Sequence, residues 1–61
     1  MGRTDFHDVE TDSLGFMTIR DLGECLAIGF GIEVDGDLDF GVSREDARRL
    51  GEALLAASAS A

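Results

Sequence analysis

Eight acidic residues are the ones whose type and spacing could do chemistry in this chain. They form two groups, a row at alternate positions and a looser set near the N-terminus: Glu33, Asp35, Asp37 and Asp39; and Asp5, Asp8, Glu10 and Asp12. Carboxylates at alternate positions of a strand lie on one face, roughly 6.8 Å apart. Such a row can coordinate a cation or attract the basic side chains of another protein. Both groups are therefore candidate partner-binding residues.

The composition indicates that these acids belong to a folded chain. Thirteen Asp and Glu residues oppose five arginines, which gives a net charge of −8, yet 44% of the residues are hydrophobic. A disordered acidic tail would lack that apolar content. Because a negative field repels nucleic acid and anionic membranes, we expect a basic protein surface as the partner, without direct binding to nucleic acid or membrane.

Catalysis is the function class that the composition opposes most strongly. General acid–base and nucleophilic mechanisms need a positioned partner for each reactive group. The chain has one histidine, His7, one cysteine, Cys25, and no tyrosine, lysine or tryptophan. We expect His7 at the surface and Cys25 as a buried structural thiol. The prediction is a protein that is not an enzyme and that binds no cofactor.

The sequence predicts one small domain over residues 1–61, located in the cytoplasm. The first residues contain no apolar run for export, and no stretch reaches the roughly 18 apolar residues of a membrane span. Cys25 is the only cysteine, so an internal disulfide is excluded. The alanine- and serine-rich tail, residues 58–61, is expected to fray.

Two short helices are predicted, over about residues 19–28 and 44–57. Apolar side chains recur at helical spacing in both stretches. Each stretch begins near a pair that approximates a capping box, Thr18 with Asp21 and Ser43 with Asp46. In the second helix, Glu45 and Arg49 have the spacing of an ion pair. For the first helix an alternative stays open, because residues 25–34 could form one long strand.

Between these helices, residues 30–34 and 38–42 alternate apolar and polar side chains and predict an antiparallel β-hairpin. A three-residue loop would pair Ile32 with Phe40 and keep the apolar side chains on one face. In that register Glu33 lies opposite Asp39, a repulsive pair. Residues 3–17 have no clean period and are allowed one short strand. The predicted fold is α+β, with a central hairpin and two helices.

The first acidic group resembles part of the calcium-binding loop of EF-hand and dockerin modules. The resemblance covers twelve residues and implies Asp35, Asp37 and Asp39 as ligands, with Asp46 at the twelfth position. Phe40 stands where that family has glycine, and the residues before Asp35 predict a strand in place of a helix. We therefore predict that no metal binds and keep a calcium module as a third hypothesis.

The small size, the charge of −8 and the α+β patterning resemble the phage-encoded anti-CRISPR proteins, several of which mimic DNA. The resemblance is one of class, carried by the two acidic groups. It implies an inhibitor in the bacterial cytoplasm that occupies the DNA-binding channel of a CRISPR surveillance complex or nuclease. The alternative is a small homodimeric adaptor or regulatory protein, since two short helices leave much of a sheet uncovered.

Overall fold

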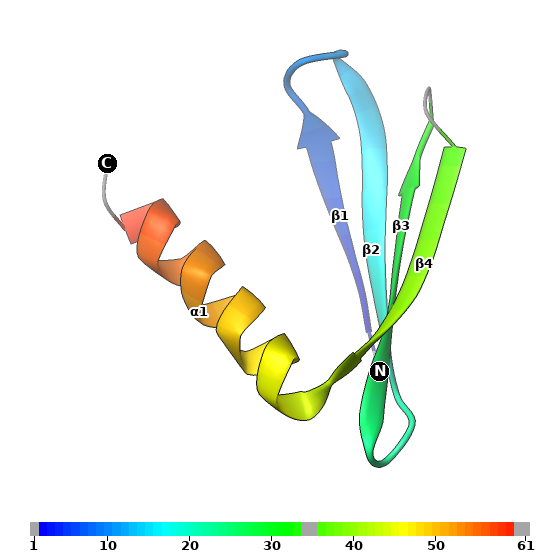
Figure 1. Cartoon of the computed structure of the whole chain (residues 1–61). Helices are drawn as coiled ribbons and strands as arrows, with labels where there is room; N and C mark the ends of the chain where they lie inside the picture. Colours follow the sequence, from blue (N-terminus) through cyan, green and yellow to red (C-terminus); the bar gives the residue numbers. More distant parts are fainter. Residues whose placement is uncertain (1, 34–35, 60–61) are drawn as a thin grey trace.

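The computed structural model describes residues 2–33 and 36–59 (Figure 1). Four antiparallel strands form one sheet in the order of the sequence, and one helix follows them in the described part: β1 (Gly2–Asp8), β2 (Ser13–Asp21), β3 (Cys25–Ile32), β4 (Gly36–Ser43) and α1 (Arg44–Ala59). The predicted α+β class is confirmed. The helix within the described residues is not long and apolar enough to cross a membrane.

The predicted helix over residues 19–28 is wrong, because β2 continues to Asp21 and β3 begins at Cys25. Between them Gly23 adopts a φ of +94°, and its N–H donates to the Asp21 carboxylate at 2.9 Å. This local side-chain bond forms a turn where a helix would need its regular backbone bonds. The alternative of a strand is confirmed for residues 25–32; Val34 lies outside the described residues.

Residues 3–17 contain more regular structure than the one short strand predicted, since β1 and part of β2 lie there. The turn between the two strands is held by Asp8, whose carboxylate accepts hydrogen bonds from the N–H groups of Glu10 at 2.9 Å and Thr11 at 3.4 Å. Asp12 closes the turn with a φ of +55°. Asp residues are well suited to both tasks, so this hairpin follows from local chemistry.

The predicted hairpin of β3 and β4 is confirmed, but its predicted register is wrong. Phe40 pairs with Ile28 in place of Ile32, and Phe30 pairs with Leu38. The shift keeps the apolar side chains on one face and stacks the rings of Phe30 and Phe40, with centroids 6.3 Å apart. The expected repulsion between Glu33 and Asp39 is absent, because glycines face the acids of β4.

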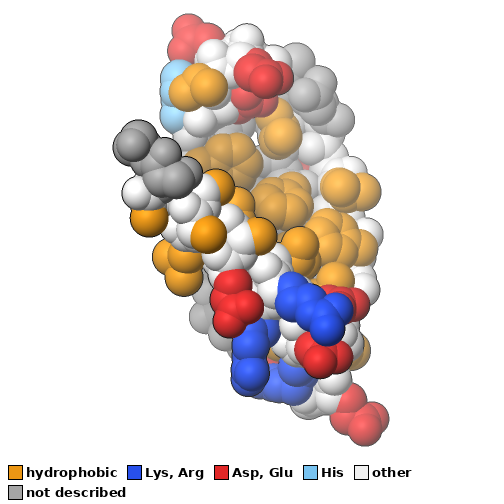
Figure 2. Space-filling model, turned by 60° about the vertical axis from the view of Figure 1, so that its left-hand side comes forward, with side chains coloured by type: hydrophobic (Ala, Val, Ile, Leu, Met, Phe, Trp, Pro, Cys, Tyr) orange, Lys and Arg blue, Asp and Glu red, His pale blue; other side chains and the backbone are white. Residues whose placement is uncertain are grey.

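One face of the sheet is apolar, and α1 lies on that side (Figures 1 and 2). We call it the apolar face; alternation along the four strands and their register give its residues as Phe6, Met17, Ile19, Leu26, Ile28, Phe30, Ile32, Leu38, Phe40 and Val42. Arg3, Asp5, Phe16, Gly31 and Asp37 alternate with these positions and lie on the opposite face.

The predicted second helix is confirmed and extends to Ala59. The prediction of a frayed tail is therefore wrong for Ser58 and Ala59, whereas residues 60–61 lie outside the described residues. The Asp46 N–H donates to Ser43 Oγ at 3.0 Å, so Ser43 caps the helix as expected. Glu45 and Arg49 form the predicted pair at 3.7 Å. Arg44 donates to the Asp21 carboxylate and to the Gly23 carbonyl, both at 2.9 Å, and so ties the start of α1 to the β2–β3 turn.

A candidate acidic groove

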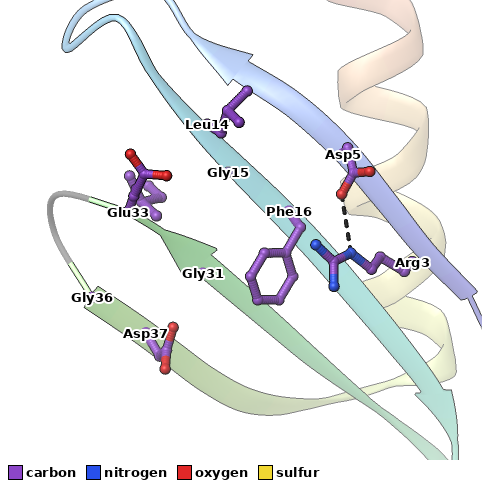
Figure 3. Close-up of a pocket in the computed structure, with 10 residues that line it drawn as sticks. Arg3, Asp5, Leu14, Gly15, Phe16, Gly31, Glu33, Gly36 and Asp37 are labelled. Carbon is purple, nitrogen blue, oxygen red and sulfur yellow. Dashed lines mark hydrogen bonds and ion pairs between the residues drawn. The ribbon is translucent and has the colours of Figure 1, made fainter.

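A groove of about 510 Å³ lies on the face of the sheet opposite α1 (Figure 3). Phe16 of β2 lies in its middle, with Leu14 beside it along the same strand. Its polar walls are formed by Arg3 and Asp5 on one side and by Glu33 and Asp37 on the other. The groove therefore combines an apolar floor with charged walls.

The floor exists because Phe16 faces a glycine on the neighbouring strand. Phe16 pairs with Gly31, and a Cβ atom at residue 31 would lie 2.5 Å from the Phe16 ring and 3.0 Å from Asp37 Oδ1. An aromatic ring over a cross-strand glycine restores packing that the missing side chain would have provided. With glycine at this position, the ring and the Asp37 carboxylate can both approach β3.

Three predicted partner-binding residues line this groove, although they come from three parts of the sequence. Asp5 belongs to β1, Glu33 to the β3–β4 turn and Asp37 to β4. The local spacing of the two acidic groups did not predict this convergence. It arises because β1, β2, β3 and β4 are successive neighbours, so that the two edge strands form opposite walls over the inner pair.

One cation lies among these carboxylates. Arg3 Nε–H donates to Asp5 Oδ1 at 3.0 Å, and the guanidinium carbon of Arg3 lies 4.2 Å from the centroid of the Phe16 ring. Within the described residues, nothing donates a hydrogen bond to the carboxylates of Glu33 and Asp37. The groove thus contains three carboxylates and one guanidinium, and two of the carboxylates have no hydrogen-bond donor among the described residues.

The other predicted partner-binding residues that the structure describes lie near the groove or at one end of the sheet. Asp39 is on the same face as Asp37, beside Gly29 and Thr18 in a smaller hollow. Glu10 and Asp12 lie in the β1–β2 turn, and Asp8 ends β1. Asp35 lies outside the described residues.

The two acidic turns lie at the same end of the sheet, because a four-stranded meander brings the β1–β2 and β3–β4 turns together (Figure 1). Two strand spacings, roughly 10 Å, separate the hairpin centres. Arg20 and Arg44 lie toward the opposite end, where β2 finishes and α1 begins. Figure 2 shows the arginines gathered there among further acids, away from the acids beside the histidine.

Two of the acids near the β1–β2 turn, Asp8 and Asp12, have structural roles. Hydrogen bonds from the Thr11 side chain and the Glu10 backbone lower the pKa of Asp8, so the carboxylate that holds the turn stays ionised well into the acid range. Asp12 Oδ1 lies 2.8 Å from His7 Nε2. His7 is exposed, as expected.

The stretch that resembles a calcium loop is not folded as a loop. Asp37 and Asp39 belong to β4, whereas Asp46 lies in α1 and pairs with Arg49 at 3.6 Å. Among the described residues, no group of three or more His, Cys, Asp or Glu side chains is placed to hold a metal ion. Cys25 is half-buried at the start of β3, where a buried helical thiol was expected.

Comparisons of the chain with protein-family models, curated proteins and solved structures found no match. Function must therefore be inferred from the groove and the charge distribution. Sequence reasoning missed Arg3 and Phe16 as residues of the site. The available signal was the Gly29-x-Gly31 spacing, which marks where neighbouring side chains can approach a strand closely, but the strand register is needed to identify those side chains.

Proposed function

We propose that this protein is an acidic decoy that binds the cationic site of another protein, one whose normal ligand is nucleic acid. The observation that carries the proposal is the convergence of Asp5, Glu33 and Asp37 around one groove with an aromatic floor. Carboxylates beside an aromatic face suit guanidinium groups, which pair with the former and stack on the latter.

Arg3 illustrates this chemistry within the chain. Its guanidinium lies over Phe16 while its Nε–H bonds to Asp5. A partner's arginine entering from the side of β4 would meet the other wall of the groove, where Glu33 and Asp37 offer two further carboxylates. Asp39 continues the row along the edge strand, roughly 6.8 Å from Asp37. This row presents successive negative charges to a basic surface, as a phosphate backbone does.

The target class follows from the resemblance in size and charge to anti-CRISPR proteins. In this proposal the chain acts in the cytoplasm of a bacterial host and occupies the DNA-binding channel of a CRISPR surveillance complex or nuclease. It has no enzymatic activity and needs no cofactor. Its affinity is steered by charge, so binding should be fast and should weaken as salt screens the exposed carboxylates.

A paired substitution with a matched control tests the groove. The variant Glu33→Gln with Asp37→Asn and the control Glu24→Gln with Glu52→Gln each remove two negative charges, from −8 to −6. An arginine-rich peptide of about eight residues serves as the probe. We expect the groove variant to weaken peptide binding by about tenfold or more and the control to change it less than about threefold. Equal effects would show that net charge acts without the groove.

The second candidate is a small homodimeric adaptor or regulatory protein. The observation that favours it is the exposure of apolar side chains on both the sheet and α1, which indicates a surface for association. This candidate requires no cationic target. It would be preferred if the groove variant bound basic partners as well as the wild-type protein.

A further inference from the structure

The apolar face and α1 leave a large apolar surface uncovered. Among the described hydrophobic side chains only Ile28 is buried, whereas Phe40 is 38%, Leu50 47% and Leu54 69% exposed. They belong to β3, β4 and α1, and Figure 2 shows hydrophobic side chains gathered over the sheet and the helix. Isolated apolar residues on a surface are ordinary, but a continuous apolar layer marks an interface.

The accessible surface of the chain supports the same conclusion. It amounts to 4873 Å². A folded monomer of 6.5 kDa is expected to expose about 3,800 Å². The excess, about 1,000 Å², is close to the area of roughly 800 Å² that each partner buries in a stable protein interface. Compared with a monomer of its mass, the chain therefore exposes an extra area about as large as one partner's side of a protein interface.

The shape indicates where the covering element would lie. Sheet and helix meet at the start of α1, where Arg44 bonds to Asp21, and they diverge toward the other end of the helix (Figure 1). Ala47 and Gly51 are half-buried, but Leu54 and Leu55 of the later turns are exposed. Exposed apolar side chains therefore lie both on the sheet and on the later turns of α1.

The distribution of charge permits two copies to meet through the apolar face. Asp5, Asp37 and Asp39 lie on the opposite face of the sheet, and Glu10 and Asp12 lie in a turn at its end. Contact through the apolar face therefore brings two chains of charge −8 together without placing those acids in the interface. The inward side of α1 presents leucine, alanine and glycine to the contact.

We propose that a second copy of this chain covers the apolar face, with the later turns of each α1 packed against the apolar face of the other copy. A two-fold axis makes such an exchange reciprocal and closes the assembly at two chains. The occupant should be present whenever the chain folds, because the described residues bury one hydrophobic side chain fully and leave little apolar burial to offset the chain entropy lost on folding. Another copy meets that condition wherever this chain is made.

The mass of the wild-type protein in solution is the first test. Light scattering coupled to size-exclusion chromatography should give twice the 6.5 kDa of one chain, 13 kDa. The melting temperature should rise with protein concentration, because association and folding are linked. A cooperatively folded monomer with a concentration-independent melting temperature would overturn the proposal, and so would an assembly larger than two chains.

A pair of leucine substitutions locates the interface. Leu54 and Leu22 are both exposed in the single chain, at 69% and 56%, but Leu22 lies in the β2–β3 turn, outside both the apolar face and α1. Leu54→Glu should raise the dimer dissociation constant at least 100-fold or prevent folding, whereas Leu22→Glu should leave the dimer intact. A dimer equally stable in both variants would overturn this interface. The result does not depend on the groove, whose residues neither variant changes.

Discussion

The Phe16 ring packs over Gly31 of the neighbouring strand so closely that a Cβ atom at residue 31 would lie 2.5 Å from the ring. Glycine at this position lets β2 and β3 pair while the ring lies across both, and the ring in turn supports the Arg3 guanidinium. The walls of the groove can converge on this floor because the Gly31 position carries no side chain. The pair therefore connects the strand register to the candidate site.

Replacing Gly31 with alanine should destabilise the fold and disturb the groove, since the added methyl group displaces the ring or shifts the strand. We expect a loss of about 1–3 kcal/mol in the free energy of unfolding, measured by urea denaturation. Gly41→Ala is the matched control, because the nearest atom to its Cβ would be the Leu26 carbonyl oxygen at 3.9 Å. Equal stability of the two variants would show that Phe16 does not pack as described.

The contact between the start of α1 and the β2–β3 turn should weaken at low pH. The Gly23 N–H and then the Arg44 guanidinium lower the pKa of Asp21. A carboxyl group whose pKa is lower in the folded chain than its ordinary value of 3.8 stabilises the fold at pH values above 3.8. This contribution is lost as the pH falls through the pKa of the folded chain. The melting temperature should therefore fall more between about pH 5 and about pH 2.5 in the wild type than in Asp21→Asn. Parallel curves would contradict this role of Asp21.

Removing the cap of α1 should have a local cost. Ser43→Ala leaves the Asp46 N–H without the hydroxyl that now accepts its bond at 3.0 Å. We expect a loss of about 1 kcal/mol in the free energy of unfolding and a lower helix signal in circular dichroism. Ser58→Ala, in the last turn, is the control and should change stability by less than half as much. A smaller effect at Ser43 than at Ser58 would refute the cap.

The sequence predicted those parts of the fold that depend on local chemistry. The Ser43 cap and the alanine- and leucine-rich stretch behind it predicted α1, and the helix forms there. The helix predicted over residues 19–28 failed because Asp21 and Gly23 form a turn that interrupts the helical spacing of the apolar residues. In that short stretch, spacing alone did not distinguish a helix from two strand ends.

The register and the groove lay beyond sequence reasoning for a different reason. Alternation fixes which face each side chain occupies, but a shift by two residues preserves every face. The observed register opposes Asp39 to Gly29 and stacks Phe30 on Phe40, and both effects depend on side-chain shape across strands. The approach of Asp5 to Glu33 and Asp37 also depends on the order of all four strands, which a local pattern does not specify.

The most direct test of the decoy proposal is competition with DNA for a CRISPR surveillance complex. Labelled target DNA is bound to a panel of such complexes and titrated with the wild-type protein, the groove variant Glu33→Gln with Asp37→Asn, and the control Glu24→Gln with Glu52→Gln. The proposal predicts that the wild type and the control displace DNA from at least one complex, at salt-dependent concentrations, and that the groove variant needs about tenfold more protein. Failure to displace DNA from any complex, or displacement by the groove variant at the wild-type concentration, would contradict it.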